Sequence, residues 1–339
     1  MSKKCKPNLF SIATGELSQD AVITWLLKWA DPDCSTYNQV LHEAATAFVT
    51  KMLEAVESGT NPVKIEKVEA GRQWENIDIW AEINDSHLII IEDKTGTDQH
   101  SDQLRRYRET AEKWCEENDR NLVCVYIKTH SESQFNRADV ERADFKVITR
   151  NHLLAILDAY HVESDIYNDF RNYLHLLNEI EFGFAKKPVG DWDDSNWKGF
   201  YQTLEEKHNI IKWHYVANPA GGFWNLVLNW HEPDGQPVLY MQIEQGDLCY
   251  KIGEVYENRR ETRDHYHEML ISASEKDSMG LQRPGRFGCG TYMTVAIVPR
   301  HVWLGADSEV VDIEAVTKRL NKYEAWFRKT IGVTANSQP

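Results

Sequence analysis

The sequence predicts an α/β fold, in which a mixed sheet flanked by helices is followed by a second domain of the α+β class. Helical patterns with one apolar face alternate with short runs of Val, Ile and aromatic residues that are typical of strands. One such run, residues 122–129, opens with an uninterrupted apolar stretch, as expected of a strand covered on both faces. With 339 residues, 42% of them hydrophobic, the chain is long enough to build two cores.

Two amphipathic helices begin the predicted order of elements. Residues 18–30 place Val22, Trp25 and Trp29 on one helical face, and Ser18 is a candidate N-cap. A polar stretch separates this helix from the next. The first half then continues with a helix at 40–57, strands at 63–71, 76–83 and 87–94, a helix at 101–118, strands at 122–129 and 145–149, and a helix at 151–160.

A change in composition marks the expected domain boundary. Between Lys186 and Asn196, Pro, Gly and acidic residues replace the periodic apolar pattern. We therefore expect one domain at residues 1–187 and a second at 188–339. The second domain is predicted to contain a helix at 197–207, strands at 223–230, 237–245 and 248–255, a helix at 259–274, a strand at 291–298 and a helix at 312–329.

The overall charge and the cysteines exclude several classes of protein. A formal net charge of −15 disfavours a protein that coats nucleic acid non-specifically, because that binding depends on phosphate neutralisation by Lys and Arg. No apolar run approaches the length of a membrane span, and no signal peptide opens the chain, so we expect a cytoplasmic protein without membrane association. The 6 cysteines lack C-x-x-C spacing, which disfavours a zinc ribbon or a disulfide framework.

An unusual charge pattern ends the strand at 87–94. Three isoleucines run directly into Glu92, Asp93 and Lys94, and charge at the end of a buried strand is costly unless it is paired. Because strand side chains alternate, Glu92 and Lys94 share one face, and Asp93 lies on the other.

The preceding strand supplies a second carboxylate. A three-residue loop, Asn84 to Ser86, would set Asp78 opposite Glu92, whereas a two-residue turn would pair Asp78 with Asp93. Opposed carboxylates repel each other unless a cation lies between them. Oxygen ligands of this kind are those that Mg²⁺ selects.

A basic helix follows this charge pattern within a few residues. Gln103 and Tyr107 are four residues apart and so lie on one helical face, with Arg106 one residue off that face. A glutamine and a phenol on a basic helix, beside a carboxylate site, suit a phosphodiester backbone better than a small apolar ligand.

The order Asp78, Glu92-x-Lys94, Gln103-x-x-x-Tyr107 resembles the PD-(D/E)xK nuclease superfamily, in its branch with a Q-x-x-x-Y helix, over about residues 10–160. The resemblance implies a restriction-endonuclease-like sheet on which Asp78, Glu92 and the backbone carbonyl of Asp93 hold Mg²⁺ or Mn²⁺. Lys94 would then position the attacking water. Substrate backbone would be oriented by Gln103, Tyr107 and Arg106.

One residue departs from the family pattern, and one position of the pattern has two candidates in this sequence. Ile77 precedes Asp78 where many members have proline, which leaves the metal ligand intact. Many members also contribute an acid from the first helix, and two candidates remain. Glu16 is preferred because "ELSQDAVITWLL" resembles the opening of one nuclease subfamily, whereas Glu43 has the advantage of lying in the helix just before the strands.

The sequence thus predicts a Mg²⁺-dependent nuclease that cuts phosphodiester bonds with metal-activated water, DNA being favoured over RNA as partner. The resemblance also implies a prokaryotic or phage defence or repair role. The alternative is a non-catalytic nucleic-acid-binding or regulatory protein on the same fold. The second domain would serve substrate recognition or regulation, and the formation of a homo-oligomer is left open.

The loop of the second domain from Arg283 to Thr291 lacks the G-x-x-x-x-G-K-[ST] pattern of a phosphate-binding loop. Its two arginines could nevertheless contact a phosphate.

Overall fold

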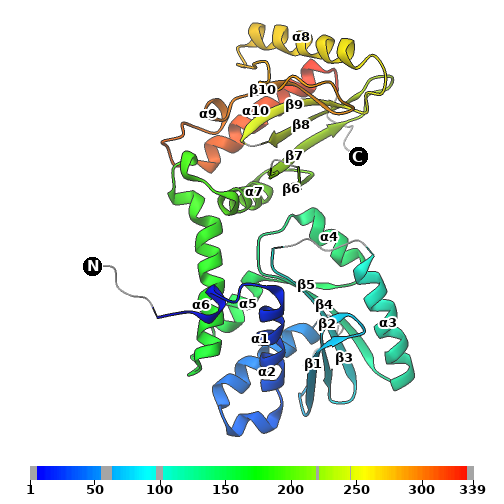
Figure 1. Ribbon diagram of the computed structural model, residues 1–339, viewed down its shortest axis with the longest axis vertical. Helices are drawn as coiled ribbons and strands as arrows, with labels where there is room; N and C mark the ends of the chain where they lie inside the picture. Colours follow the sequence, from blue (N-terminus) through cyan, green and yellow to red (C-terminus); the bar gives the residue numbers. More distant parts are fainter. Residues whose placement is uncertain (1–5, 55–62, 97–101, 219–220, 245, 334–339) are drawn as a thin grey trace. The chain divides into compact units, whose positions relative to one another are not determined.

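The computed structural model describes residues 6–54, 63–96, 102–218, 221–244 and 246–333. The chain divides into two compact units, each built around its own five-stranded sheet (Figure 1). The first unit comprises Met1–Glu132 and Asn136–Glu179, and the second comprises Ser133–Phe135 and Ile180–Pro339.

The sheet of the first unit is mixed, and this confirms the predicted fold class. Its strands follow the order β1-β2-β3-β4-β5, with antiparallel pairing from β1 to β3 and parallel pairing from β3 to β5. Every residue of the central strand β3 is buried, because helices cover both faces of the sheet. The strands are β1 Val68–Trp74, β2 Ile77–Ile83, β3 His87–Lys94, β4 Asn121–Lys128 and β5 Lys146–Thr149.

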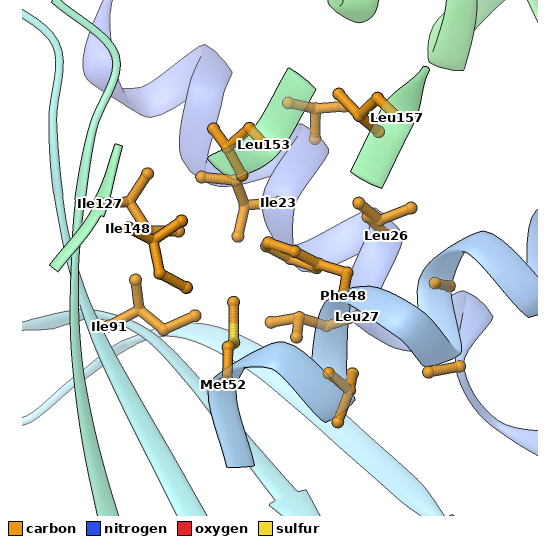
Figure 2. Packing of buried hydrophobic residues seen from close by; sticks show 14 of the residues in the cluster. Ile23, Leu26, Leu27, Phe48, Met52, Ile91, Ile127, Ile148, Leu153 and Leu157 are labelled. Carbon is orange, nitrogen blue, oxygen red and sulfur yellow. The ribbon is translucent and has the colours of Figure 1, made fainter. Parts of the chain in front are cut away.

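Two helical layers enclose this sheet. On one face pack α1 Glu16–Trp29, α2 Gln39–Leu53, α5 Arg150–Leu157 and α6 Asp165–Glu181, and on the other α3 Gln103–Asn118 and α4 Gln134–Arg142. Figure 2 shows the first layer, where Phe48 and Met52 of α2 meet Ile91 of β3 and Ile127 of β4. Each fully buried side chain of this size contributes about 1.5–3 kcal/mol to folding. The core therefore fixes α1 and α2 firmly against β3.

The second unit has an antiparallel sheet in the order β10-β9-β8-β7-β6. Its core is rich in aromatic side chains, among them the fully buried Trp213 and Trp303. The strands are β6 Lys212–Val216, β7 Phe223–His231, β8 Val238–Glu244, β9 Asp247–Gly253 and β10 Met293–Val298, and the helices are α7 Asp194–Lys207, α8 Arg259–Asp277, α9 Arg300–Trp303 and α10 Ile313–Thr330.

Several predicted boundaries were wrong. Helix α1 begins at Glu16 rather than after Ser18, with Gly15 as its N-cap. Strand β1 begins at Val68 rather than Val63. The predicted end of the second helix, together with Ser101 and Gln245 of other predicted elements, lies outside the described residues. Among the helices that the structure describes, none has the length and apolar character needed to cross a bilayer.

Candidate active site

The hairpin of β2 and β3 sets the register of the acidic residues. Ile83 pairs with His87 across the three-residue connection, and Ile79 pairs with Ile91. Continuing this register by one residue on each strand places Asp78 opposite Glu92, so the predicted hairpin is confirmed. The tight turn depends on Asn84 and Asp85, whose φ angles of 56° and 50° lie in the left-handed region that Asn and Asp tolerate.

The ammonium group of Lys94 lies among three carboxylates. Its Nζ is 2.6 Å from Oε1 of Glu92, 3.8 Å from Oε2 of Glu16 and 3.9 Å from Oδ2 of Asp78. The same Nζ donates a hydrogen bond to the backbone carbonyl of Asp93 at 3.3 Å. The structure thus gathers the predicted residues of β2, β3 and the first turn of α1 around one cation.

Only one of the two candidate acids from the helices joins this cluster. Glu16 reaches Lys94 from the first turn of α1, and its Oε1 also accepts a hydrogen bond from the backbone N–H of Thr95. Glu43 instead lies on the exposed face of α2, where it accepts a hydrogen bond from Gln39. Glu43 lines a separate hollow of about 510 Å³ beside Tyr160. The structure therefore brings Glu16, and not Glu43, to the Lys94 cluster.

A chain of buried polar residues that the sequence patterns did not predict lies behind the cluster. The side chain of Asp93 is fully buried and accepts a hydrogen bond of 2.6 Å from Nε2 of Gln19. Gln19 accepts one from Thr129 at 3.0 Å, and Arg150 donates to the carbonyl of Thr129 at 2.7 Å. Glu16, Gln19 and the buried Asp20 are spaced i, i+3, i+4. Polar residues at that spacing on an otherwise buried helical face were the available signal.

Burial and mutual repulsion alter the ionisation of these carboxyl groups. Burial, reinforced by the charge of Asp78, raises the pKa of Glu92 to about 8 and that of Asp20 to about 6. Burial opposes the charge on Lys94, but the carboxylates of Glu92, Glu16 and Asp78 outweigh it and raise the pKa of the ammonium. Lys94 consequently stays protonated at neutral pH, whereas Glu92 tends to retain a proton.

The carboxylates fit a divalent cation. Apart from the ion pair with Lys94, neither side-chain oxygen of Glu92 has a hydrogen-bond partner among the described residues. Within that part of the chain, no group of three or more His, Cys, Asp and Glu side chains forms a preassembled metal site. Mg²⁺ does not require one, because it is usually held by one or two carboxylates together with water and substrate phosphates. Asp78, Glu92 and the carbonyl of Asp93 supply that kind of donor set.

Helix α3 presents the predicted glutamine and tyrosine together. Nε2 of Gln103 donates to the hydroxyl of Tyr107 at 2.9 Å. Burial raises the pKa of Tyr107, and the charges of Glu92 and Asp78 contribute to this rise, so the phenol lies near the acidic cluster. Arg106, the third residue predicted to bind substrate, does not join this pair. Its side chain is exposed and donates a hydrogen bond to the carbonyl of Asp102.

Comparison with known proteins agrees with this arrangement. Residues 7–210, more than half of the chain, match the model of the PD-(D/E)XK nuclease superfamily. The chain belongs to this superfamily. The predicted family is thus confirmed, and membership indicates a nuclease. PD-(D/E)XK nucleases act on nucleic acid and typically use divalent metal ions. Searches among curated proteins and among solved structures found no match.

Proposed function

We propose that this PD-(D/E)XK protein is a metal-dependent nuclease that hydrolyses phosphodiester bonds, with DNA as its substrate. The observation that carries this proposal is the position of Lys94, within 4 Å of the carboxylates of Glu92, Asp78 and Glu16 at the end of the central strand. Buried carboxyl groups with a raised pKa are frequent at catalytic sites. A lysine held beside such a group places positive charge next to the reacting group.

In this proposal Asp78, Glu92 and the carbonyl of Asp93 would hold Mg²⁺ or Mn²⁺. When bound, the cation supplies positive charge for the scissile phosphate and increases the acidity of water. The residues of the chain then have distinct tasks. Lys94, which remains protonated, donates hydrogen bonds that orient the attacking water and stabilise negative charge on the phosphate. In this proposal the role of Lys94 is electrostatic.

Glu16 completes the set in this proposal. It accepts from the backbone N–H of Thr95 and lies beside Lys94, so it holds the end of β3 and the ammonium in place. Gln103 and Tyr107 orient the substrate backbone. Because Gln103 donates to the oxygen of Tyr107, the phenolic proton can donate to a phosphate oxygen.

The test is a cleavage assay on supercoiled, linear and single-stranded DNA and on RNA, with Mg²⁺ or Mn²⁺. RNA is included because contacts to phosphate do not depend on the sugar. Wild type should give metal-dependent products, and Lys94→Ala should be slower by at least about 100-fold. Lys64→Ala is the matched control, because Lys64 is exposed and paired with Glu66 away from the cluster.

The cleavage assay distinguishes a nuclease from a non-catalytic protein. Metal-dependent cleavage that Lys94→Ala abolishes and Lys64→Ala retains supports the proposal. Cleavage that survives Lys94→Ala would point to a contaminant or to another site and overturn the role of Lys94. Intact substrates under every metal and pH condition would exclude the proposal in favour of a binding or regulatory protein on the same fold.

A further inference from the structure

The second unit carries four arginines, at the start of one helix and in one loop, that the proposed cleavage site does not use. Arg259 and Arg260 begin helix α8, and Arg283 and Arg286 lie in the loop that leads to β10. None of these four forms an ion pair with another described residue. Unpaired like charges repel one another when they gather on one surface. In a chain with a formal net charge of −15, such a group of cations points to an anionic ligand.

A fifth arginine fixes the loop in place. The guanidinium carbon of Arg263 lies 3.9 Å from the centre of the Phe287 ring, and that of Arg283 lies 4.3 Å from it. Distances this short arise only over a face of the ring, and one face has no room for two guanidinium groups. Arg263 and Arg283 therefore stack on opposite faces of Phe287.

The two arginines play different parts in this stack. The side chain of Arg263 is only 11% exposed, and it pairs with Asp264 at 2.6 Å. Arg263 also donates to the carbonyls of Phe287 and Gly288, at 3.0 Å and 3.2 Å. A buried arginine thus holds a glycine-rich segment that would otherwise have many conformations. Arg283 is left exposed on the outer face of the ring, in a defined position.

An open hollow of about 850 Å³ adjoins this loop. Arg259, Arg260 and Cys289 line it together with Tyr256, a residue that is 71% exposed. Two carboxylates, Glu261 and Asp264, also line the hollow, and Asp264 is engaged by Arg263. The hollow therefore combines guanidinium groups with an accessible aromatic ring.

We propose that this surface of the second unit binds a single-stranded segment of DNA. This inference rests on the proposed function for its choice of ligand. Guanidinium groups pair with phosphates in bidentate geometry, and an exposed phenol stacks on an unpaired base. A duplex hides the faces of its bases inside the helix, so Tyr256 would have no stacking partner there. Arg259, Arg260, Arg283 and Arg286 contact phosphates, and Tyr256 contacts a base.

Fluorescence anisotropy tests this binding without cleavage. The full-length Lys94→Ala protein is titrated in EDTA against a labelled oligothymidylate and against a hairpin duplex of equal nucleotide number. The single strand should bind more tightly than the duplex. For Arg283→Gln combined with Arg286→Gln, the slope of log affinity against log salt should become shallower by about 1.4, or 0.7 for each lost phosphate contact. Tyr256→Ala should weaken binding at least about fivefold.

The matched control is Lys318→Gln combined with Lys322→Gln, which removes the same charge from exposed positions on α10. Equal affinities and salt slopes for the two double variants would overturn the inference, as would a preference for the duplex. Thermal unfolding of each variant shows whether the fold is retained. Because hydrolysis is absent from this assay, a failure of binding here and a failure of cleavage in the nuclease assay are separate results.

Discussion

Gln19 donates a hydrogen bond of 2.6 Å to the buried carboxyl group of Asp93, and so joins α1 directly to β3. Glu16 lies one helical turn before Gln19, and Glu92 and Lys94 flank Asp93 on the strand. The bond therefore controls the distance between the acid from α1 and the charged residues of β3. It lies on the opposite face of the strand from the Lys94 ammonium.

Replacing Gln19 by leucine should slow the reaction without weakening substrate binding. The buried Asp93 would lose its partner, which lowers the free energy of unfolding by about 1–3 kcal/mol. Displacement of Glu16 should reduce kcat roughly tenfold and leave KM unchanged. Urea unfolding and cleavage kinetics measure both effects. Gln39→Leu makes the same change on the exposed face of α2 and should alter neither. A Gln19→Leu variant with raised KM and normal kcat would contradict the positioning role.

Substitution of the two helix acids should separate Glu16 from Glu43. Glu16 lies 3.8 Å from Lys94, so Glu16→Gln should reduce the cleavage rate about 100-fold. Glu43→Gln should keep the wild-type rate within about twofold, because surface substitutions away from the site rarely matter. Initial rates on the preferred substrate, at saturating Mg²⁺, provide the comparison. If the Glu43 variant proves the slower of the two, the assignment of Glu16 is wrong.

The stability of the metal-free protein should depend on pH through Glu92. In the folded state its pKa is raised to about 8, whereas in the unfolded chain it lies near the ordinary value of about 4.3. Between these values the folded state binds more protons, so the free energy of unfolding falls as pH rises and levels off above about pH 8. The slope is at most about 1.4 kcal/mol per pH unit. Glu92→Gln should remove this contribution, while that of Asp20, whose pKa is also raised, remains below about pH 6.

Urea unfolding in EDTA across this pH range measures the slope, with the exposed Glu66→Gln as control. Mg²⁺ should raise the melting temperature of wild type, and more so at pH 8 than at pH 6, because the cation displaces the proton of Glu92. A Mg²⁺ effect of equal size in Glu92→Gln would show that the ion binds elsewhere.

Tyr107→Phe should weaken transition-state binding while leaving the packing of α3 intact. The variant loses only the hydroxyl group that Gln103 orients. A hydrogen bond to a charged oxygen contributes about 1.5–3 kcal/mol, so kcat/KM should fall roughly 10- to 100-fold. Tyr37→Phe, at a residue that is 82% exposed, is the control. Unchanged kcat/KM in Tyr107→Phe would remove the phenol from the substrate site.

The sequence predicted the features that local patterns determine. The alternation of β3 and an assumed three-residue turn at Asn84 placed Asp78 opposite Glu92, and the structure decides against the two-residue turn that the sequence left open. The preference for Glu16 over Glu43 rested on a resemblance and left both acids as candidates, because each lies on an amphipathic helix and only the packing of α1 and α2 orients them. The contacts of Gln19 with Asp93 and Thr129 were missed for the same reason, since they join distant segments.

The error at the start of β1 has a specific cause. Val63 and Ile65 alternate as in a strand, and both pack against the core. The backbone from Lys64 to Lys67, however, bonds to Asn84 of the following turn instead of a neighbouring strand, mainly through the Asn84 side chain. Asn84 accepts from the N–H groups of Glu66 and Lys67 and donates to the carbonyl of Lys64. Side-chain competition of this kind is invisible to a periodicity argument. The short strand β6 was overlooked; it lies at the sheet edge, where, among the described strands, it pairs with β7.

The charges around Lys94 also affect the binding of nucleic acid to the metal-free protein. One ammonium faces three carboxyl groups, so acidic groups outnumber basic groups at the metal-free site. A polyanion approaching it in that state is repelled. Under the proposed function, a phosphate would therefore be admitted only when a divalent cation is already bound by these carboxylates or arrives together with the phosphate. The metal-free protein would keep nucleic acid away from its own reactive centre.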